Sequence, residues 1–99
     1  MTDSTLRIVR QIRAVPKGSV CSYRDIALKA GLPNGARQVA RVLHSLSEKL
    51  DLPWHRIIRY DGSIALEAGA GKELQTALLR AEGVEVSAAG KVDMRRFGV

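Results

Sequence analysis

The segment that most constrains the fold is "NGARQVARVLHSLS", residues 34–47. Aliphatic residues recur there at the spacing of one helix face: Val39, Val42, Leu43 and Leu46. Basic residues recur with the same period on the opposite side: Arg37, Arg41 and His44. The pattern predicts a helix from about Asn34 to Ser47, with Asn34 as its N-cap. One face of this helix would pack on a core and the other would carry positive charge.

A second, shorter helix is predicted just before this one. Ser22 and Asp25 form an S-x-x-D pattern, in which a serine caps the free amides at a helix start. Gly31 suits the position after the last turn, and Pro33 prevents continuation, so the helix ends near Ala30. Because only Gly31-Leu32-Pro33 separates the two helices, the sequence predicts a helix-turn-helix.

The remaining patterns complete a small α+β domain. Leu6, Val9, Ile12 and Val15 predict an amphipathic helix over residues 5–15, ended by Pro16-Lys17-Gly18. Asp61-Gly62 between two short β-prone runs, residues 57–60 and 63–66, predicts a β-hairpin. A last helix is expected over Leu74–Ala81, and short strands at Val84–Val86 and Val92–Met94. We therefore expect residues 1–99 to form one winged-helix-like DNA-binding domain with a β-hairpin wing.

Charge favours a polyanionic partner. The 99 residues include 16 Lys and Arg against 10 Asp and Glu, which gives a net charge of +6. Nucleic acid is the first candidate for so small a basic domain. No apolar run approaches the length of a membrane span, and the N-terminus lacks the apolar core of a signal peptide. A single cysteine, Cys21, allows no internal disulfide, so we expect a cytoplasmic setting. Without a dimerisation helix, we expect a monomer.

The start of the helix near residue 35 is the best candidate for contact with DNA. Gly35 and Ala36 are small, and a helix N-terminus favours phosphate. Arg37 could contact a phosphate, read a base edge or enter the base stack, although a solvated basic face explains it too. Tyr23, at the start of the preceding helix, could pack in the core or donate a hydrogen bond to a phosphate.

The sequence offers little for catalysis. Cys21 precedes a helix cap, in a position typical of a buried and inert thiol. His55 could act as a general base, but it lies between Trp54 and Arg56, with no nucleophile beside it. Two histidines and one cysteine, widely separated, provide no metal-ligand spacing, and no phosphate loop or dinucleotide fingerprint is present. We expect no metal and no cofactor.

Two segments together resemble a known family. "VPKGSVCSYRDIALKAGLPNGARQVARVL" and "LPWHRIIRYDGSI" are similar to the C-terminal DNA-binding domain of O6-alkylguanine-DNA alkyltransferases, and the similarity extends from about Leu6 to Gly83. Those transferases carry Pro-Cys-His-Arg, whose cysteine accepts the alkyl group. Pro53, Trp54, His55 and Arg56 occupy this motif here. With tryptophan in the acceptor position, the chain resembles the alkyltransferase-like proteins.

The resemblance implies roles for residues on the DNA side. Tyr23 matches the tyrosine that presses on the phosphate of the target nucleotide. Arg37 matches the arginine that fills the gap left by a flipped base, on a helix that enters the minor groove. Gly35, Ala36, Gln38 and Arg41 of the same helix are expected to contact DNA with it.

The resemblance also implies a lesion pocket formed by Pro53, Trp54, His55 and Arg56. His55 and Glu82 match the pair that activates the acceptor cysteine. With Trp54 in its place, the implied function is non-enzymatic recognition of O6-alkylguanine, with the lesion passed to nucleotide excision repair. Two departures stand out: no asparagine ends the recognition helix, and Glu67 stands where some relatives carry an arginine.

Two other functions remain open on the sequence. A winged-helix transcription regulator would read a specific sequence, normally through the major groove. An active transferase would have to use Cys21 as its acceptor.

Overall fold

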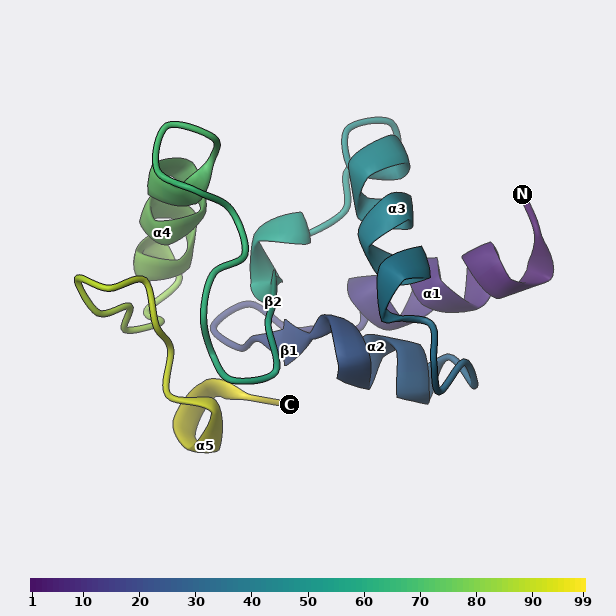
Figure 1. Cartoon of the computed structure of the whole chain (residues 1–99), viewed down its shortest axis with the longest axis horizontal. Helices are drawn as coiled ribbons and strands as arrows, with labels where there is room; N and C mark the ends of the chain where they lie inside the picture. Colours follow the sequence, from purple (N-terminus) through teal and green to yellow (C-terminus); the bar gives the residue numbers. More distant parts are fainter.

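The computed structural model describes all 99 residues, as five helices, one 3-10 turn and one pair of short strands (Figure 1). The elements are α1 (Asp3–Arg13), β1 (Cys21–Ser22), α2 (Tyr23–Lys29), α3 (Ala36–Leu46), η1 (Trp54–Arg56), β2 (Ile57–Ile58), α4 (Lys72–Ala81) and α5 (Met94–Phe97). The predicted α+β class is confirmed. No helix in the structure is long and apolar enough to cross a membrane.

The predicted helix-turn-helix is α2 followed by α3. The Ser22 hydroxyl accepts a hydrogen bond from the backbone N–H of Asp25 at 3.0 Å, so the predicted cap of α2 is confirmed. The N-cap of α3 is Gly35, and the prediction of Asn34 is wrong. The N–H of Gly35 donates to the Leu32 carbonyl at 2.8 Å, and a Cβ on Gly35 would lie only 2.9 Å from the Leu32 Cβ. This tight turn starts α3 one residue later than expected.

The helix-turn-helix and α1 share the larger of two cores. It includes Ile8 and Ile12 of α1, Ile26 of α2, and Val39 and Val42 of α3. Helix α1 begins at Asp3, two residues earlier than expected, and Leu6 is 40% exposed while Ile8 is fully buried. The apolar face is therefore rotated from the predicted one.

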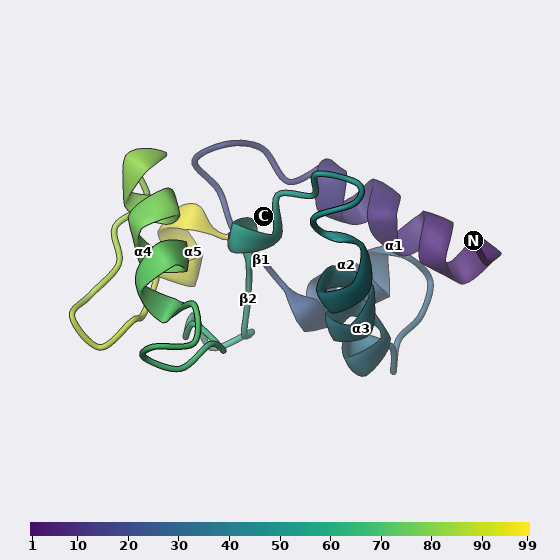
Figure 2. The same cartoon turned by 90° about the horizontal axis from the view of Figure 1, so that it is seen from above.

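A second core joins α4 to the C-terminal part of the chain. It contains Leu79 of α4, Ile64 from the loop after β2, and the valines at 84, 86 and 92. Figure 2 shows α1, α2 and α3 on one side of the molecule and α4 and α5 on the other, with β2 between them. The two helical groups are thus linked through the strand pair.

The strand pair brings two distant parts of the chain side by side. β1 and β2 pair in parallel, with Cys21 opposite Ile57 and Ser22 opposite Ile58. Tyr23 follows β1 directly, and the η1 turn that begins at Trp54 leads directly into β2. The parallel register therefore places these two aromatic residues in the same region of the molecule, although 31 positions separate them in sequence.

The predicted β-hairpin wing is wrong beyond its turn. The turn itself forms: the N–H of Arg59 donates to the Ser63 carbonyl at 2.9 Å, and Gly62 has a φ of +91°. The chain then leaves β2, because Ile64 is buried in the second core. Its N–H donates to the Gly90 carbonyl at 3.0 Å, so residues 62–64 pair with residues 90–92 instead.

The predicted strands Val84–Val86 and Val92–Met94 do not form, although Ser63 and Lys91 make one isolated antiparallel bridge. Val84, Val86 and Val92 are buried from irregular backbone, so their pattern reflects core packing rather than a ladder. Met94 begins α5. Two hydrogen bonds to Val20 fix the end of the chain. The Val20 N–H donates to the Phe97 carbonyl, and the Val20 carbonyl accepts from the Val99 N–H, both at 2.9 Å.

Candidate nucleic-acid interface and pocket

A pocket of about 620 Å³ lies against the C-terminal half of α3. Helix α3 and the turn after it supply most of its lining, while η1, α2, α4 and the loop after β2 add single residues. The lining residues are Tyr23, Ala40, Leu43, His44, Ser47, Glu48, Asp51, Leu52, Trp54, Leu66 and Gln75. This volume lies within the usual range of small-molecule pockets.

Trp54 packs on the first core and also lines this pocket. Its side chain is partly buried against that core, so it is anchored rather than free. Its indole lies edge-on to the His55 ring, with centroids 6.1 Å apart and an angle of 85° between the planes. Trp54 can therefore offer an aromatic surface to a ligand without losing its position.

The turn between α3 and η1 positions Trp54 from one side. The N–H of Leu52 donates to the Ser47 carbonyl at 2.9 Å and that of Asp51 to the Glu48 carbonyl at 3.3 Å. Asp51 has a φ of +50°, so this is the Schellman arrangement that ends a helix. The Arg13 side chain donates to the Leu50 carbonyl at 2.9 Å, which ties the turn to the end of α1.

A cluster around Glu82 holds η1 from the other side. Arg56 donates to both carboxylate oxygens of Glu82, at 2.9 and 2.8 Å, and His55 Nε2 lies 2.8 Å from Oε2. Arg56 also donates to the Val15 carbonyl at 3.0 Å. These four residues link η1 to α1 and α4.

The Arg56 hydrogen bonds, with smaller contributions from His55 and the Gly18 N–H, lower the pKa of Glu82 from 4.5 to about 2. Glu82 is therefore ionised at neutral pH and cannot donate. The hydrogen in the His55 contact must therefore lie on Nε2, which donates to Glu82. The pair has the arrangement of a base and its orienting acid, but the residue that precedes this base in sequence is Trp54.

Gln75 was missed by the sequence analysis. It is only 2% exposed, and its side-chain amide donates to the carbonyls of His55 at 3.0 Å and Ile57 at 3.2 Å. It thus fixes η1 and β2 against α4 while it lines the pocket. No pattern in the sequence around Gln75 indicates that its side chain is buried or that it bonds to η1 and β2.

Of the four predicted lesion-pocket residues, only Trp54 lines the larger pocket. Pro53, His55 and Arg56 line a second hollow of about 500 Å³, with Arg13 and Leu78. Three residues line both hollows: Asp51, Leu52 and Trp54. The Glu82 contacts draw His55 and Arg56 to this side. In the structure these three residues hold the segment around Trp54 and do not line the larger pocket.

The predicted DNA-contact residues of α3 divide into two groups. Arg37 and Arg41 are exposed and make no hydrogen bond or ion pair within the protein, so both are free for a ligand. Gly35 is needed for the close turn against Leu32. Gln38 instead donates to the Ser4 hydroxyl of α1 at 3.0 Å. Arg37 and Arg41 thus supply the free positive charge of this face of α3.

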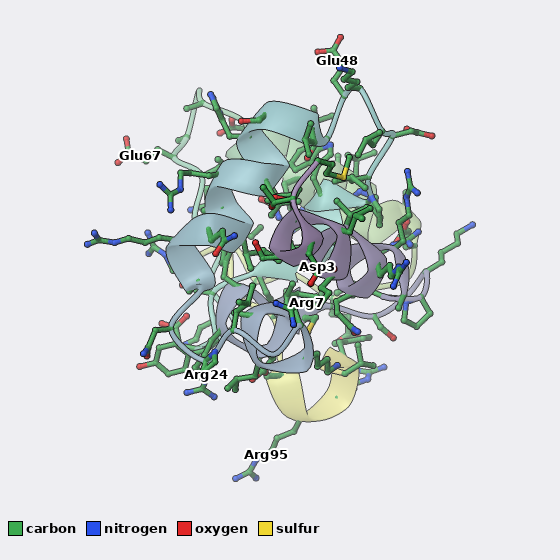
Figure 3. The ribbon with its side chains drawn as sticks, turned by 90° about the vertical axis from the view of Figure 1, so that its right-hand side faces the viewer. Asp3, Arg7, Arg24, Glu48, Glu67 and Arg95 are labelled. Carbon is green, nitrogen blue, oxygen red and sulfur yellow. The ribbon has the colours of Figure 1, made fainter.

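Tyr23 lies between the core and the pocket. It is partly buried against the first core, and this burial raises the pKa of its hydroxyl, against the smaller opposing effect of Arg59. It is therefore a neutral donor in reach of a ligand in the pocket. Beside it, the Arg24 guanidinium lies 4.8 Å from the centre of the exposed Tyr60 ring, and Figure 3 shows Arg24 at the edge of the molecule.

Cys21 has the buried position that the sequence predicted. It is fully buried in β1, and this burial raises the pKa of its thiol. Its Sγ accepts a long contact from Lys29 at 3.9 Å. No group of three His, Cys, Asp or Glu side chains could hold a metal ion.

The chain belongs to the family described as 6-O-methylguanine DNA methyltransferase, DNA binding domain, whose model matches residues 3–84. It is 43% identical over 91 residues to the DNA base-flipping protein of Escherichia coli, and the match covers 92% of this chain and 70% of that protein. It is 40% identical to the DNA base-flipping protein of Vibrio parahaemolyticus, over 98% of this chain and 96% of that one.

Solved structures agree with this assignment. Schizosaccharomyces pombe Atl1, in complex with damaged DNA containing O6-carboxymethylguanine, has a TM-score of 0.84 at 30% identity. The match covers 98% of this chain and 94% of Atl1. Mycobacterium tuberculosis OGT in complex with DNA has a TM-score of 0.66 at 28% identity, over 83% of this chain and 50% of that one.

Proposed function

From the family to which the chain belongs and from the geometry of the pocket, we propose that the protein recognises O6-alkylguanine in DNA without removing the alkyl group. It binds the minor groove, flips the damaged nucleotide out of the stack and holds the base in the pocket beside Trp54. The observation that carries this proposal is Trp54 itself. By the resemblance it stands in the acceptor position of the family motif, and it lines the pocket in which we place the flipped base.

The residues around the pocket suit the steps of flipping. Arg37, exposed and unpaired near the start of α3, can enter the gap in the base stack. Tyr23, at the edge of the pocket, can donate to the phosphate of the extruded nucleotide. Flipping costs a few kcal/mol and costs less for a mispaired base. Stacking on an aromatic side chain returns about 1–3 kcal/mol, so Trp54 can decide whether a flipped base is retained.

The lack of a nucleophile supports binding without transfer. The indole of Trp54 is not a nucleophile toward an alkyl group at neutral pH. Cys21 is fully buried, and its raised pKa keeps it a thiol. His55 and Glu82 therefore have no acceptor to activate.

A lesion that is held but not repaired needs a later repair step. We propose that the protein directs it to nucleotide excision repair, as the resemblance to alkyltransferase-like proteins implies. The lesion complex would then mark the damaged site for other proteins.

The test is a comparison of binding to two duplexes that differ only in one O6-methylguanine. The proposal predicts tighter binding to the damaged duplex and loss of this preference in Trp54→Ala, with salt-sensitive binding to undamaged DNA retained. Leu74→Ala is the matched control, because Leu74 is an exposed apolar residue of α4 that does not line the pocket. Equal affinity of the wild type for both duplexes would favour a sequence-reading regulator instead.

A further inference from the structure

The pocket is acidic, in a protein that is basic overall. Its charged lining consists of Glu48 and Asp51, with His44 as the only other titratable side chain besides Tyr23. No lysine or arginine lines it, although the chain has a net charge of +6. A ligand in this pocket would therefore lie near two carboxylates, both on solvent-exposed residues.

The carboxylate of Asp51 has no local structural use. With a φ of +50°, Asp51 occupies the position after a helical turn that glycine or asparagine normally takes. It lies at the negative end of that turn, where an anion is unfavourable. It makes no hydrogen bond or ion pair through its side chain. Asparagine adopts this positive φ at least as readily, so the backbone conformation does not require the charge of Asp51. The charge acts only on groups near it.

The same wall holds a polar atom with no partner. The Ser47 hydroxyl oxygen is buried and makes no hydrogen bond within the protein, and Ser47 lines the pocket. A buried hydroxyl without a partner is uncommon, and a bond from this one to a ligand would require the Ser47 side chain to rotate toward the pocket. Ser47, Glu48 and Asp51 together form what we call the acidic wall.

Figure 3 shows the charge arrangement around this wall. Glu48 lies at the top of the molecule, beyond the C-terminal end of α3, and Glu67 lies at the side on the loop after β2. Arg24 and Arg95 lie at the lower end. These two arginines thus lie at the opposite end from Glu48 in this view, whereas Asp51 also lines the second hollow together with Arg13 and Arg56.

We propose that the acidic wall makes the protein select among O6-alkylguanines by charge. It accepts neutral and positively charged substituents on O6 and disfavours substituents that end in a carboxylate. This inference rests on the proposed function, because the wall acts only on a base that enters the pocket. It sets the chain apart from S. pombe Atl1, whose structure contains O6-carboxymethylguanine.

The test compares duplexes that carry one O6-carboxymethylguanine or one O6-(2-hydroxyethyl)guanine, whose substituents are similar in size and differ in charge. A third duplex carries O6-(2-aminoethyl)guanine and a fourth carries guanine. At low salt the wild type should bind the hydroxyethyl duplex about tenfold more tightly than the carboxymethyl duplex, since two carboxylates line the pocket and their repulsion of an anion is then little screened. The aminoethyl duplex should bind at least as tightly as the hydroxyethyl duplex.

The variants assign this preference to the wall. In Glu48→Gln/Asp51→Asn the hydroxyethyl-to-carboxymethyl ratio should fall to below about threefold, because the two charges that repel the carboxymethyl group are gone. Glu85→Gln is the control, because it removes an exposed acid that does not line the pocket, and it should keep the wild-type ratio. The ratio corrects for any general gain in DNA affinity when an acid is removed.

Two results would overturn the inference and leave the proposed function standing. One is equal binding of the carboxymethyl and hydroxyethyl duplexes by the wild type, both tighter than guanine. The other is a ratio that the double variant leaves at the wild-type value. Binding of the hydroxyethyl duplex no tighter than that of the guanine duplex would overturn the proposed function and this inference together.

Discussion

Glu82 should be one of the strongest single contributors to the stability of this domain. It accepts two hydrogen bonds from Arg56 and one from His55, and its side chain is 11% exposed. Glu82→Gln keeps the size of the side chain and removes the charge. The 17%-exposed Arg56 side chain then loses its ionic partner, and η1 loses its link to the end of α4.

The magnitude follows from the pKa of Glu82. A fall from 4.5 to about 2 corresponds to about 3 kcal/mol of preference for the ionised form in the folded state. Removal of one partner from a largely buried ion pair costs a similar amount, about 3–5 kcal/mol. For a domain of about 100 residues, 1 kcal/mol shifts Tm by about 4–8 °C. For a loss of about 3 kcal/mol we therefore expect a Tm about 12–24 °C below that of the wild type.

The assay is thermal unfolding followed by circular dichroism, with Glu85→Gln as the matched control. Glu85 also pairs with an arginine, Arg96, at 2.9 Å, but these side chains are 72% and 61% exposed. Loss of such an exposed pair costs less than about 1 kcal/mol. If Glu82→Gln unfolded within about 3 °C of Glu85→Gln, the conclusion that the Glu82 cluster fixes η1 would be refuted.

Three further predictions concern acid stability, backbone and DNA contact. Because the pKa of Glu82 is lowered, its contribution to stability is complete above pH 4.5 and is lost as the pH falls toward about 2. In urea unfolding, the free energy of unfolding should therefore fall more steeply with acid in the wild type than in Glu82→Gln. Gly62→Ala should lower the free energy of unfolding by at least about 1–3 kcal/mol in the same assay, since the φ of Gly62 is +91° and a Cβ would clash with the Val92 carbonyl oxygen. An unchanged stability would contradict the pairing of residues 62–64 with residues 90–92. Arg37→Ala should weaken binding to O6-methylguanine DNA more than binding to undamaged DNA, whereas equal losses in a gel shift would reduce Arg37 to a phosphate contact.

The sequence predicted the parts of the fold that depend on local chemistry. The strict period of Val39, Val42 and Leu43 and the Ser22 cap are local signals. Helix α2 begins where its cap placed it, and α3 forms as predicted except that it starts one residue later. The turn at Asp61-Gly62 also formed. Its continuation did not, because burial of Ile64 in the second core overrode the hairpin preference of the turn.

The site depends on contacts that are distant in sequence. The parallel pair that brings Tyr23 near Trp54 has two residues in each strand, too few to show any periodicity. The motif around Trp54 predicted the contact between His55 and Glu82 through the family resemblance, yet gave no sign that Arg56 would be the main partner of Glu82. Gln75 and the positive φ of Asp51 have no local pattern and could be found only in the structure.

The central claim is recognition of the lesion without transfer of the alkyl group. The most direct measurement isolates the complex formed with a duplex that carries one O6-methylguanine, then determines the intact mass of the protein and the base content of the DNA. The account predicts an unchanged protein mass and full recovery of O6-methylguanine. A gain of about 14 Da on the protein, the mass of one CH₂ group, together with conversion of the lesion to guanine, would contradict it.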